Sequence, residues 1–219
     1  MNVQDVTNHF QLLKNSEKAI GMSAYMKNHF EFMGIQTPDR KKATSTLFKE
    51  WQVGKKAVDW EFIFDLWEQR EREYQYVAID YLKKSKKLLV SEDLPKIKKL
   101  IITKSWWDTI DNLASGVVGH IILEFPEQVK VMDEWVNDDN MWVRRTAILH
   151  QLSFKDKTDE KRLFSYCQRH GDDKEFFIAK AIGWSLRQYA KTNPQSVITF
   201  VENTPLQNLS KREALKHVK

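Results

Sequence analysis

This chain of 219 residues is 42% hydrophobic and 30% charged, so it can bury a substantial core, which excludes a disordered protein. It contains only seven glycines and five prolines, which favours a helix-rich protein over a turn-rich β-sandwich. The net charge of +5 and the pI of about 9.1 are mild, so charge alone does not identify a nucleic-acid-binding protein.

The cysteine count and the N-terminal sequence bear on the cellular compartment. Cys167 is the only cysteine, which excludes an internal disulfide and indicates a reducing environment. The first residues lack the basic and apolar regions of a secretory signal, and no run approaches ~18 uninterrupted apolar residues. We therefore expect a cytoplasmic protein without a membrane segment.

The first half of the chain is predicted to form helices joined by short connections. Thr37 and Pro38 predict a helix start, with threonine as the cap and proline at the first helical position. That helix is expected to run to about Glu50. Amphipathic patterns predict further helices over residues 3–14, 17–30, 57–68, 72–84 and 92–103.

The second half continues in the same way, and no segment has the pattern of a strand. Ser105 followed by Asp108 has the spacing of a capping box, as does Ser210 followed by Glu213, so both pairs predict helix starts. Asn193-Pro194 predicts a third. After Ser105 and the glycines at 116 and 119, helices are expected near 117–124, 127–136, 140–152, 158–170, 174–191, 194–203 and 210–218.

An internal repeat runs through these predicted helices. Alanines recur at spacings of 35, 36, 33 and 34 residues, and small residues suit the positions where paired helices approach most closely. We therefore predict an all-α superhelical solenoid of helix pairs, forming a single domain over residues 1–219 with a concave face for an extended partner. The repeated alanines are Ala43, Ala78, Ala114, Ala147 and Ala181.

Several kinds of chemistry have no support in the sequence. There is no glycine-rich phosphate loop and no nucleophile elbow. The six histidines never occur at the spacing of helical metal ligands, and one cysteine cannot anchor a zinc site. We therefore expect neither a metal nor a cofactor.

A group of indoles, a carboxylate and arginines is the strongest candidate site. Trp107 and Asp111 stand four residues apart, which places both on one face of a helix. In the repeat register Trp184 falls near the same face, and Arg144 occupies the position equivalent to Asp111 one repeat later. With Arg187 beside them, these residues form a plausible site for a cation attached to a polyanion.

These residues, with further motifs along the chain, make the sequence similar to the AlkD-type DNA alkylation repair glycosylases of bacteria, which are built from HEAT-like repeats. The resemblance covers essentially the whole chain. It is carried by Tyr-Met-Lys-Asn-His-Phe at 25–30, Gly-Ile-Gln-Thr-Pro at 34–38, Thr-Lys-Ser-Trp-Trp-Asp at 103–108 with Asp111, Trp142 with Arg145, Lys-Glu-Phe-Phe-Ile at 174–178, Ala-Ile-Gly-Trp at 181–184, Tyr-Ala-Lys-Thr-Asn-Pro at 189–194 and Ser-Lys-Arg-Glu-Ala at 210–214.

The resemblance implies a role for each matching residue. Asp111 would be the catalytic carboxylate, and Trp107 and Trp184 would flank the deoxyribose of the lesion. Arg145 would hold the DNA backbone, whereas the helical arithmetic above favours Arg144 at that place; we follow the family pattern. Further candidate DNA contacts are Tyr25, Lys27, Arg144 and Arg187.

The implied function is a glycosylase that cleaves the N-glycosidic bond of cationic alkylated purines, chiefly N3-methyladenine and N7-methylguanine, in duplex DNA. It would leave an abasic site for base excision repair and act as a monomer. One alternative is a non-catalytic DNA-binding repeat protein that recognises distorted or branched DNA. Another is a protein-binding helical scaffold, the commonest use of such solenoids.

Overall fold

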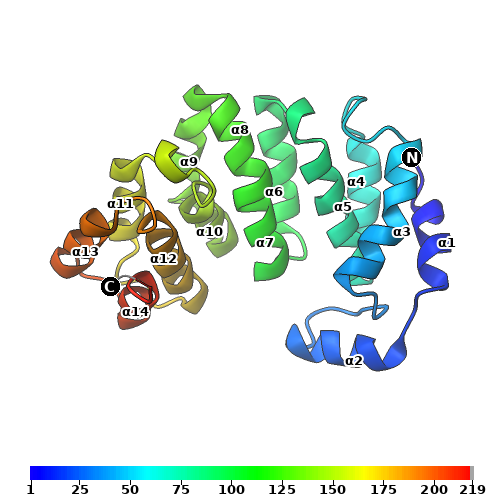
Figure 1. The fold of residues 1–219 in the computed structure, drawn as a ribbon, viewed down its shortest axis with the longest axis horizontal. Coiled ribbons are helices and arrows are strands. Elements are labelled where there is room, and N and C mark those ends of the chain that lie inside the picture. The colour runs from blue at the N-terminus through cyan, green and yellow to red at the C-terminus, as the bar shows by residue number, and fades with distance from the viewer. Residues whose placement is uncertain (218–219) are drawn as a thin grey trace. The chain divides into compact units, whose positions relative to one another are not determined.

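The computed structural model describes residues 1–217, which form two compact units, residues 1–89 and residues 90 onward (Figure 1). The described residues are helical and contain no strand; Glu31 and Glu71 form an isolated β-bridge. The prediction of an all-α protein is therefore confirmed, while the single domain and the superhelical solenoid with a concave face stay predictions. None of the described helices is long and apolar enough to cross a membrane.

The first unit contains five α-helices and a short 3-10 helix. Its core is formed by aliphatic and aromatic side chains on α1, α3, α4 and α5, such as Phe10, Leu47, Leu66 and Val77. In order, the helices are α1 (Val3–Gln11), α2 (Ser16–Tyr25), α3 (Thr37–Glu50), α4 (Trp60–Glu68), α5 (Arg72–Lys84) and η1 (Lys86–Leu88).

The predicted helix over residues 17–30 is too long at its C-terminal end. Helix α2 ends at Tyr25, and Lys27 and Asn28 adopt the left-handed conformation, with φ of 57° and 58°. That conformation ends a helix and is tolerated by asparagine better than by most residues. The predicted threonine cap of α3 is also wrong by one residue, because Thr37 is the first helical residue and Gln36 precedes the helix.

A buried carboxylate holds the segment that leads into α3. Glu73 on α5 is fully buried, and its Oε1 accepts the backbone N–H groups of Met33, Gly34 and Ile35 at 3.0, 2.9 and 3.0 Å. Burial raises the pKa of this carboxyl, and the backbone N–H groups oppose the rise. The contact satisfies three consecutive donors that would otherwise be left without a partner in the interior.

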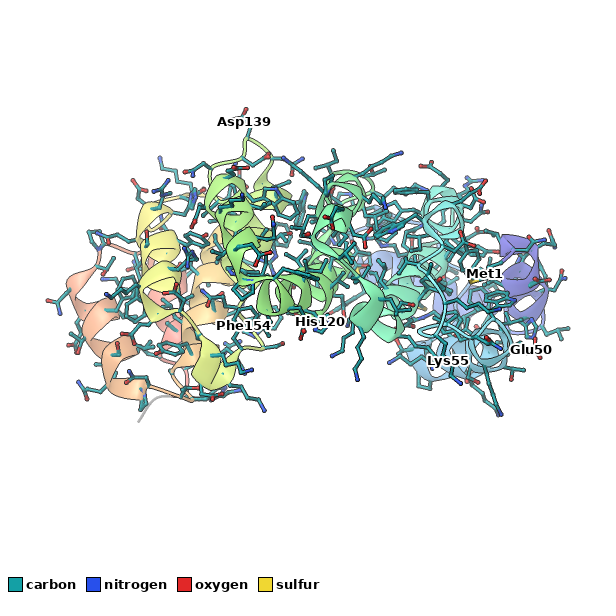
Figure 2. All side chains as sticks on the ribbon, turned by 90° about the horizontal axis from the view of Figure 1, so that it is seen from above. Met1, Glu50, Lys55, His120, Asp139 and Phe154 are labelled. Carbon is teal, nitrogen blue, oxygen red and sulfur yellow. The ribbon has the colours of Figure 1, made fainter. Side chains whose placement is uncertain are left out.

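The second unit carries the remaining helices. Helix α10 packs between α7 and α12, and α14 packs on α12 (Figure 1). Asp139 precedes α10 and Phe154 follows it, and Figure 2 shows them on opposite sides of this unit. In order, the elements are η2 (Ser91–Asp93), α6 (Leu94–Ile102), α7 (Trp107–Leu113), η3 (Ala114–Val118), α8 (Gly119–Glu124), η4 (Pro126–Gln128), α9 (Val129–Trp135), α10 (Met141–Leu149), η5 (Lys155–Lys157), α11 (Glu160–Arg169), α12 (Phe176–Tyr189), α13 (Pro194–Asn203) and α14 (Asn208–Ala214).

The expected break near the glycines at 116 and 119 does not occur. Helices α7 and α8 are joined by a π-helical segment, η3, so the chain stays helical from Trp107 to Glu124. Gly119 allows a close helix contact, since a Cβ there would lie 2.3 Å from the carbonyl oxygen of His150. The glycine is therefore required by packing against the end of α10, not by a turn.

The repeated alanines lie in or against the core. Ala78, Ala114, Ala147 and Ala181 are fully buried, and Ala43 is half-buried. Each therefore occupies a packed position, which is compatible with the repeat predicted from their spacing.

Candidate active site

A pocket in the second unit brings together most of the predicted site residues. It encloses about 280 Å³ between α7, α10, α12 and α14. Aromatic side chains form much of its wall, and two acids and three cations supply the polar groups. The lining residues are Trp107, Asp111, Arg145, Phe176, Phe177, Lys180, Trp184, Arg187 and Glu213.

Helix α7 presents Trp107 and Asp111 to this pocket, as their spacing predicts. The start of the helix differs from the prediction, because α7 begins at Trp107 and follows Trp106. Ser105 does not act as its cap: the serine hydroxyl donates a hydrogen bond of 2.6 Å to the carbonyl oxygen of Ile101, at the end of α6. The predicted capping box is therefore wrong, whereas the shared face of the indole and the carboxylate is confirmed.

The two adjacent tryptophans diverge. Trp106 packs against Trp142 and Phe177, with ring centroids 5.7 and 5.0 Å away, while Trp107 lines the pocket. The ring centroids of Trp142 and Phe177 are themselves 5.0 Å apart, so the three rings form a cluster that includes one lining residue of the pocket, Phe177. Such a cluster restricts motion of the N-terminal ends of α7, α10 and α12 relative to one another, which keeps the pocket wall in place.

Arg145 on α10 holds the Asp111 carboxylate with two parallel hydrogen bonds. Its Nε donates to Oδ1 at 2.8 Å and its Nη2 to Oδ2 at 2.9 Å, while Nη1 donates to the carbonyl oxygen of Phe177. The side chain of Arg145 is 4% exposed and that of Asp111 is 14% exposed. The guanidinium therefore fixes the plane of the carboxylate, whose exposed part faces the pocket.

Burial and Arg145 act in opposite directions on Asp111. Burial raises the pKa of the carboxyl above its ordinary value of 3.8, and the hydrogen bonds and charge of Arg145 limit the rise. The group is consequently poised nearer to neutral pH than a surface aspartate. A carboxylate in this environment is a candidate base or electrostatic catalyst.

Helix α12 supplies the opposite wall with side chains at helical spacing. Lys180, Trp184 and Arg187 follow one another at four and three residues, so they lie along one face. Glu213 of α14 contacts both cations: Lys180 Nζ lies 3.0 Å from Oε1 and Arg187 Nη1 lies 2.6 Å from Oε2. Trp184 stands between the two cations in sequence and is half-buried.

The two neighbouring arginines of α10 have different positions. Arg145 lines the pocket, and its guanidinium donates to the Asp111 carboxylate and to the carbonyl oxygen of Phe177. Arg144 lies outside the lining: its Nη1 donates to the carbonyl oxygens of Asp138 and Asp139 at 2.9 Å, and its Nη2 is 3.8 Å from Asp173. The helical arithmetic that favoured Arg144 for the pocket face was thus wrong by one residue. DNA contact by either arginine stays a prediction.

Tyr25 and Lys27 belong to the first unit. Tyr25 ends α2 and is 69% exposed, and Lys27 lies in the turn that follows. Their exposure is compatible with binding a partner, and their role as DNA contacts stays a prediction.

Sequence reasoning missed four lining residues. Lys180 could have been found, because it lies four residues before Trp184 on the same helical face. Phe176 and Phe177 occur in a motif that carries the family resemblance, but nothing in their spacing assigns them to a pocket. Glu213 had no local signal, because its spacing from Ser210 suggested a helix cap.

Comparisons with known proteins identify the family of this chain. A family model described as DNA alkylation repair enzyme matches residues 6–218. The chain belongs to the DNA alkylation repair enzyme family. Membership of this family supports a role in the repair of alkylated DNA.

Two solved structures are similar to this DNA alkylation repair family member. One is titled "Predicted DNA alkylation repair enzyme from Enterococcus faecalis"; it is 36% identical, with a TM-score of 0.88 over 94% of this chain and 96% of that chain. The other is the smu.31 protein of Streptococcus mutans, which is 18% identical, with a TM-score of 0.59 over 82% of this chain and 99% of that chain, and shows the fold alone. No curated protein matches.

Proposed function

We propose that the pocket is the active site of a DNA glycosylase that removes cationic alkylated purines, N3-methyladenine and N7-methylguanine, from duplex DNA and leaves an abasic site. The observation that carries the proposal is the Asp111 carboxylate, which faces a cavity between Trp107 and Trp184 in a DNA alkylation repair family member. A cavity of about 280 Å³ is near the lower end of ligand-pocket sizes and suits a deoxyribose.

In the proposed reaction, the bond between C1′ of the sugar and the purine nitrogen breaks, and its electron pair leaves with the base. An alkylated purine already carries a positive charge, so it departs as a neutral molecule and needs no acid catalyst. The sugar becomes oxocarbenium-like, and the fixed Asp111 carboxylate opposes the developing charge. Water then adds to C1′ and its proton passes to the carboxylate or to solvent, as in glycoside hydrolysis.

The two indoles complete the proposed site. A sugar held against the faces of Trp107 and Trp184 would be positioned for attack, and its cation would gain about 0.5–2 kcal/mol from each favourable ring face. Each ~1.4 kcal/mol gained only in the transition state raises the rate tenfold. Lys180 and Arg187, on the same wall, are suitably charged for the neighbouring phosphates.

The first test is release of N7-methylguanine from duplex DNA under single-turnover conditions. We expect base release by the wild-type protein and a loss of about 100-fold or more in Asp111→Asn, because the substitution removes the charge that opposes the oxocarbenium ion. Asp139→Asn is the matched control, since Asp139 is exposed and lies outside the pocket lining. DNA binding and thermal unfolding should be measured for all three proteins.

Removing one partner of the Asp111–Arg145 pair can also destabilise the fold. Trp107→Phe leaves that pair intact, so a several-fold slower release in this variant provides a second test. A wild-type protein that binds the duplex but frees neither N7-methylguanine nor N3-methyladenine would contradict the glycosylase proposal and favour the non-catalytic DNA-binding protein.

A further inference from the structure

The carboxylate of Glu213 bridges two cations on the pocket wall. One oxygen is 3.0 Å from Lys180 Nζ and the other is 2.6 Å from Arg187 Nη1, which also lies 3.5 Å from the backbone oxygen of Glu213. The cations are seven residues apart on α12, two helical turns, whereas Glu213 belongs to α14. A single acid from one helix thus fixes two flexible side chains of another.

The close approach of α14 to α12 makes this bridge possible. Gly183 lies between Lys180 and Arg187, and a Cβ at that position would come 2.5 Å from Glu213 Cβ and 2.9 Å from the carbonyl oxygen of Ser210. The hydroxyl of Ser210 donates to the carbonyl oxygen of Ala179 at 2.9 Å. These contacts place Glu213 against the glycine, where its carboxylate reaches both cations.

The charges in the pocket lining leave an excess of one positive charge. Arg145 is paired with Asp111, while Lys180 and Arg187 share the one carboxylate of Glu213. The hydrogen bond from Lys180 holds the pKa of the Glu213 carboxyl below its ordinary value, so the group is ionised at neutral pH. Glu213 uses one of the three ammonium donors of Lys180 and one nitrogen of Arg187, and the other donors can bind a phosphate oxygen.

We propose that Glu213 is a positioning residue, which holds Lys180 and Arg187 ready to bind the phosphodiester beside the lesion. The proposal rests on the glycosylase function above. Lysine and arginine lose considerable side-chain freedom when they are ordered, and here Glu213 orders them before DNA arrives. The same carboxylate partly neutralises the two cations, so it lowers the affinity for duplex DNA in general while it places the sugar for reaction.

Glu213→Gln separates these two effects. The amide keeps the size of the side chain and one acceptor, but it cannot neutralise two cations. We expect base release at saturating enzyme to slow about tenfold, while binding to an undamaged duplex stays equal or becomes tighter. The slope of log affinity against log salt should become steeper, by about 0.9 for each additional phosphate contacted. Glu202→Gln is the matched control, because Glu202 is exposed on α13.

A purely structural role would give a different result. In that case Glu213→Gln would lower the thermal stability and leave both the rate of base release at saturating enzyme and the salt slope unchanged. That outcome overturns the proposal. Glu213→Asp retains the charge but is too short to reach both cations, so we expect a rate between those of the wild type and Glu213→Gln; it serves as the test if the glutamine variant does not fold.

The binding measurement also distinguishes the two proposals. If the wild-type protein releases no base, the glycosylase function fails, yet the salt slope of Glu213→Gln on undamaged duplex DNA still reports whether Glu213 competes with phosphate for Lys180 and Arg187. If base release is normal in the wild type and unaffected in the variant, only the positioning role fails.

Discussion

The Asp111–Arg145 pair combines two requirements at the scale of single residues. The carboxylate must be buried to act strongly on a nearby cation, and burial disfavours its charged form. Arg145 offsets this cost through two hydrogen bonds and its charge, without covering the part of Asp111 that faces the pocket. Because the pKa of Asp111 is raised, ionisation of this carboxyl lowers the stability of the folded protein as pH rises through that pKa. The ionised group is the one that can act on a nearby cation.

This pair predicts how base release should depend on pH. The proposed mechanism requires ionised Asp111, so the enzymatic rate should fall as pH decreases, with a midpoint above the ordinary aspartate value of 3.8. Single-turnover rates measured at pH 4–8, corrected for spontaneous release from the same DNA, test this. The residual activity of Asp111→Asn should lack the acidic limb. A wild-type midpoint at or below 3.8 would contradict the role of burial.

At the scale of the helix, α12 and α14 pack closely against each other at the pocket, where Gly183 of α12 lies against Ser210 and Glu213 of α14. Ser210 and Glu213 have the spacing of a capping box, but α14 begins at Asn208, two residues before Ser210. Both side chains instead form tertiary contacts with α12. Serine and glutamate can either cap a helix or form tertiary contacts, because a hydroxyl and a carboxylate can bind both backbone and side-chain groups.

Gly183 should therefore be sensitive to the addition of one methyl group. We expect Gly183→Ala to reduce the free energy of unfolding by about 1–3 kcal/mol, because the new Cβ would lie within 3.0 Å of Glu213 Cβ and of the Ser210 carbonyl oxygen. Urea denaturation provides the measurement.

The control is the same substitution in α2. A Cβ at Gly21 would meet nothing within 4 Å, so Gly21→Ala should gain about 0.5–1 kcal/mol from the lower backbone entropy of the unfolded chain. Stabilisation by both substitutions would show that helix propensity, and not packing between α12 and α14, decides the effect at Gly183.

The stability of the whole molecule should depend on pH through a buried histidine. His150 is 1% exposed, and its Nδ1 lies 2.6 Å from the carbonyl oxygen of Ala147. Burial lowers its pKa from 6.5 to about 4. Because the unfolded chain binds the proton more readily, the stability that neutral His150 contributes is fully present above pH 6.5 and is lost as pH falls from 6.5 toward 4.

We expect protonation of His150 to lower the free energy of unfolding by roughly 3 kcal/mol between pH 7 and pH 4, since each pKa unit corresponds to ~1.4 kcal/mol. The measurement is the free energy of unfolding in urea across this range. His150→Gln cannot titrate there, so its stability should fall less. The carboxyl groups titrate in both proteins and cancel in the comparison. Parallel pH profiles for the two proteins would contradict the assignment.

The sequence by itself determined the class of fold and predicted five of the residues that line the pocket. Helical periodicity located α5 and α13 with their observed ends, and Pro38 located the first turn of α3 although the cap is Gln36. The side chain of Asn193 caps α13, as Asn193-Pro194 predicts. Trp107 with Asp111, and Trp184 with Arg187, could be assigned to common faces because positions three and four residues apart are fixed by helix geometry.

Only the tertiary structure decided which side chains meet across helices. It placed Arg145, not Arg144, against Asp111, because one residue changes the direction of a side chain by about 100° and the repeat register was uncertain by one residue. It also joined Glu213 to Lys180 and Arg187, which lie 33 and 26 residues away in the chain. Local spacing carries no information about such contacts, since they depend on how closely α14 approaches α12 at Gly183.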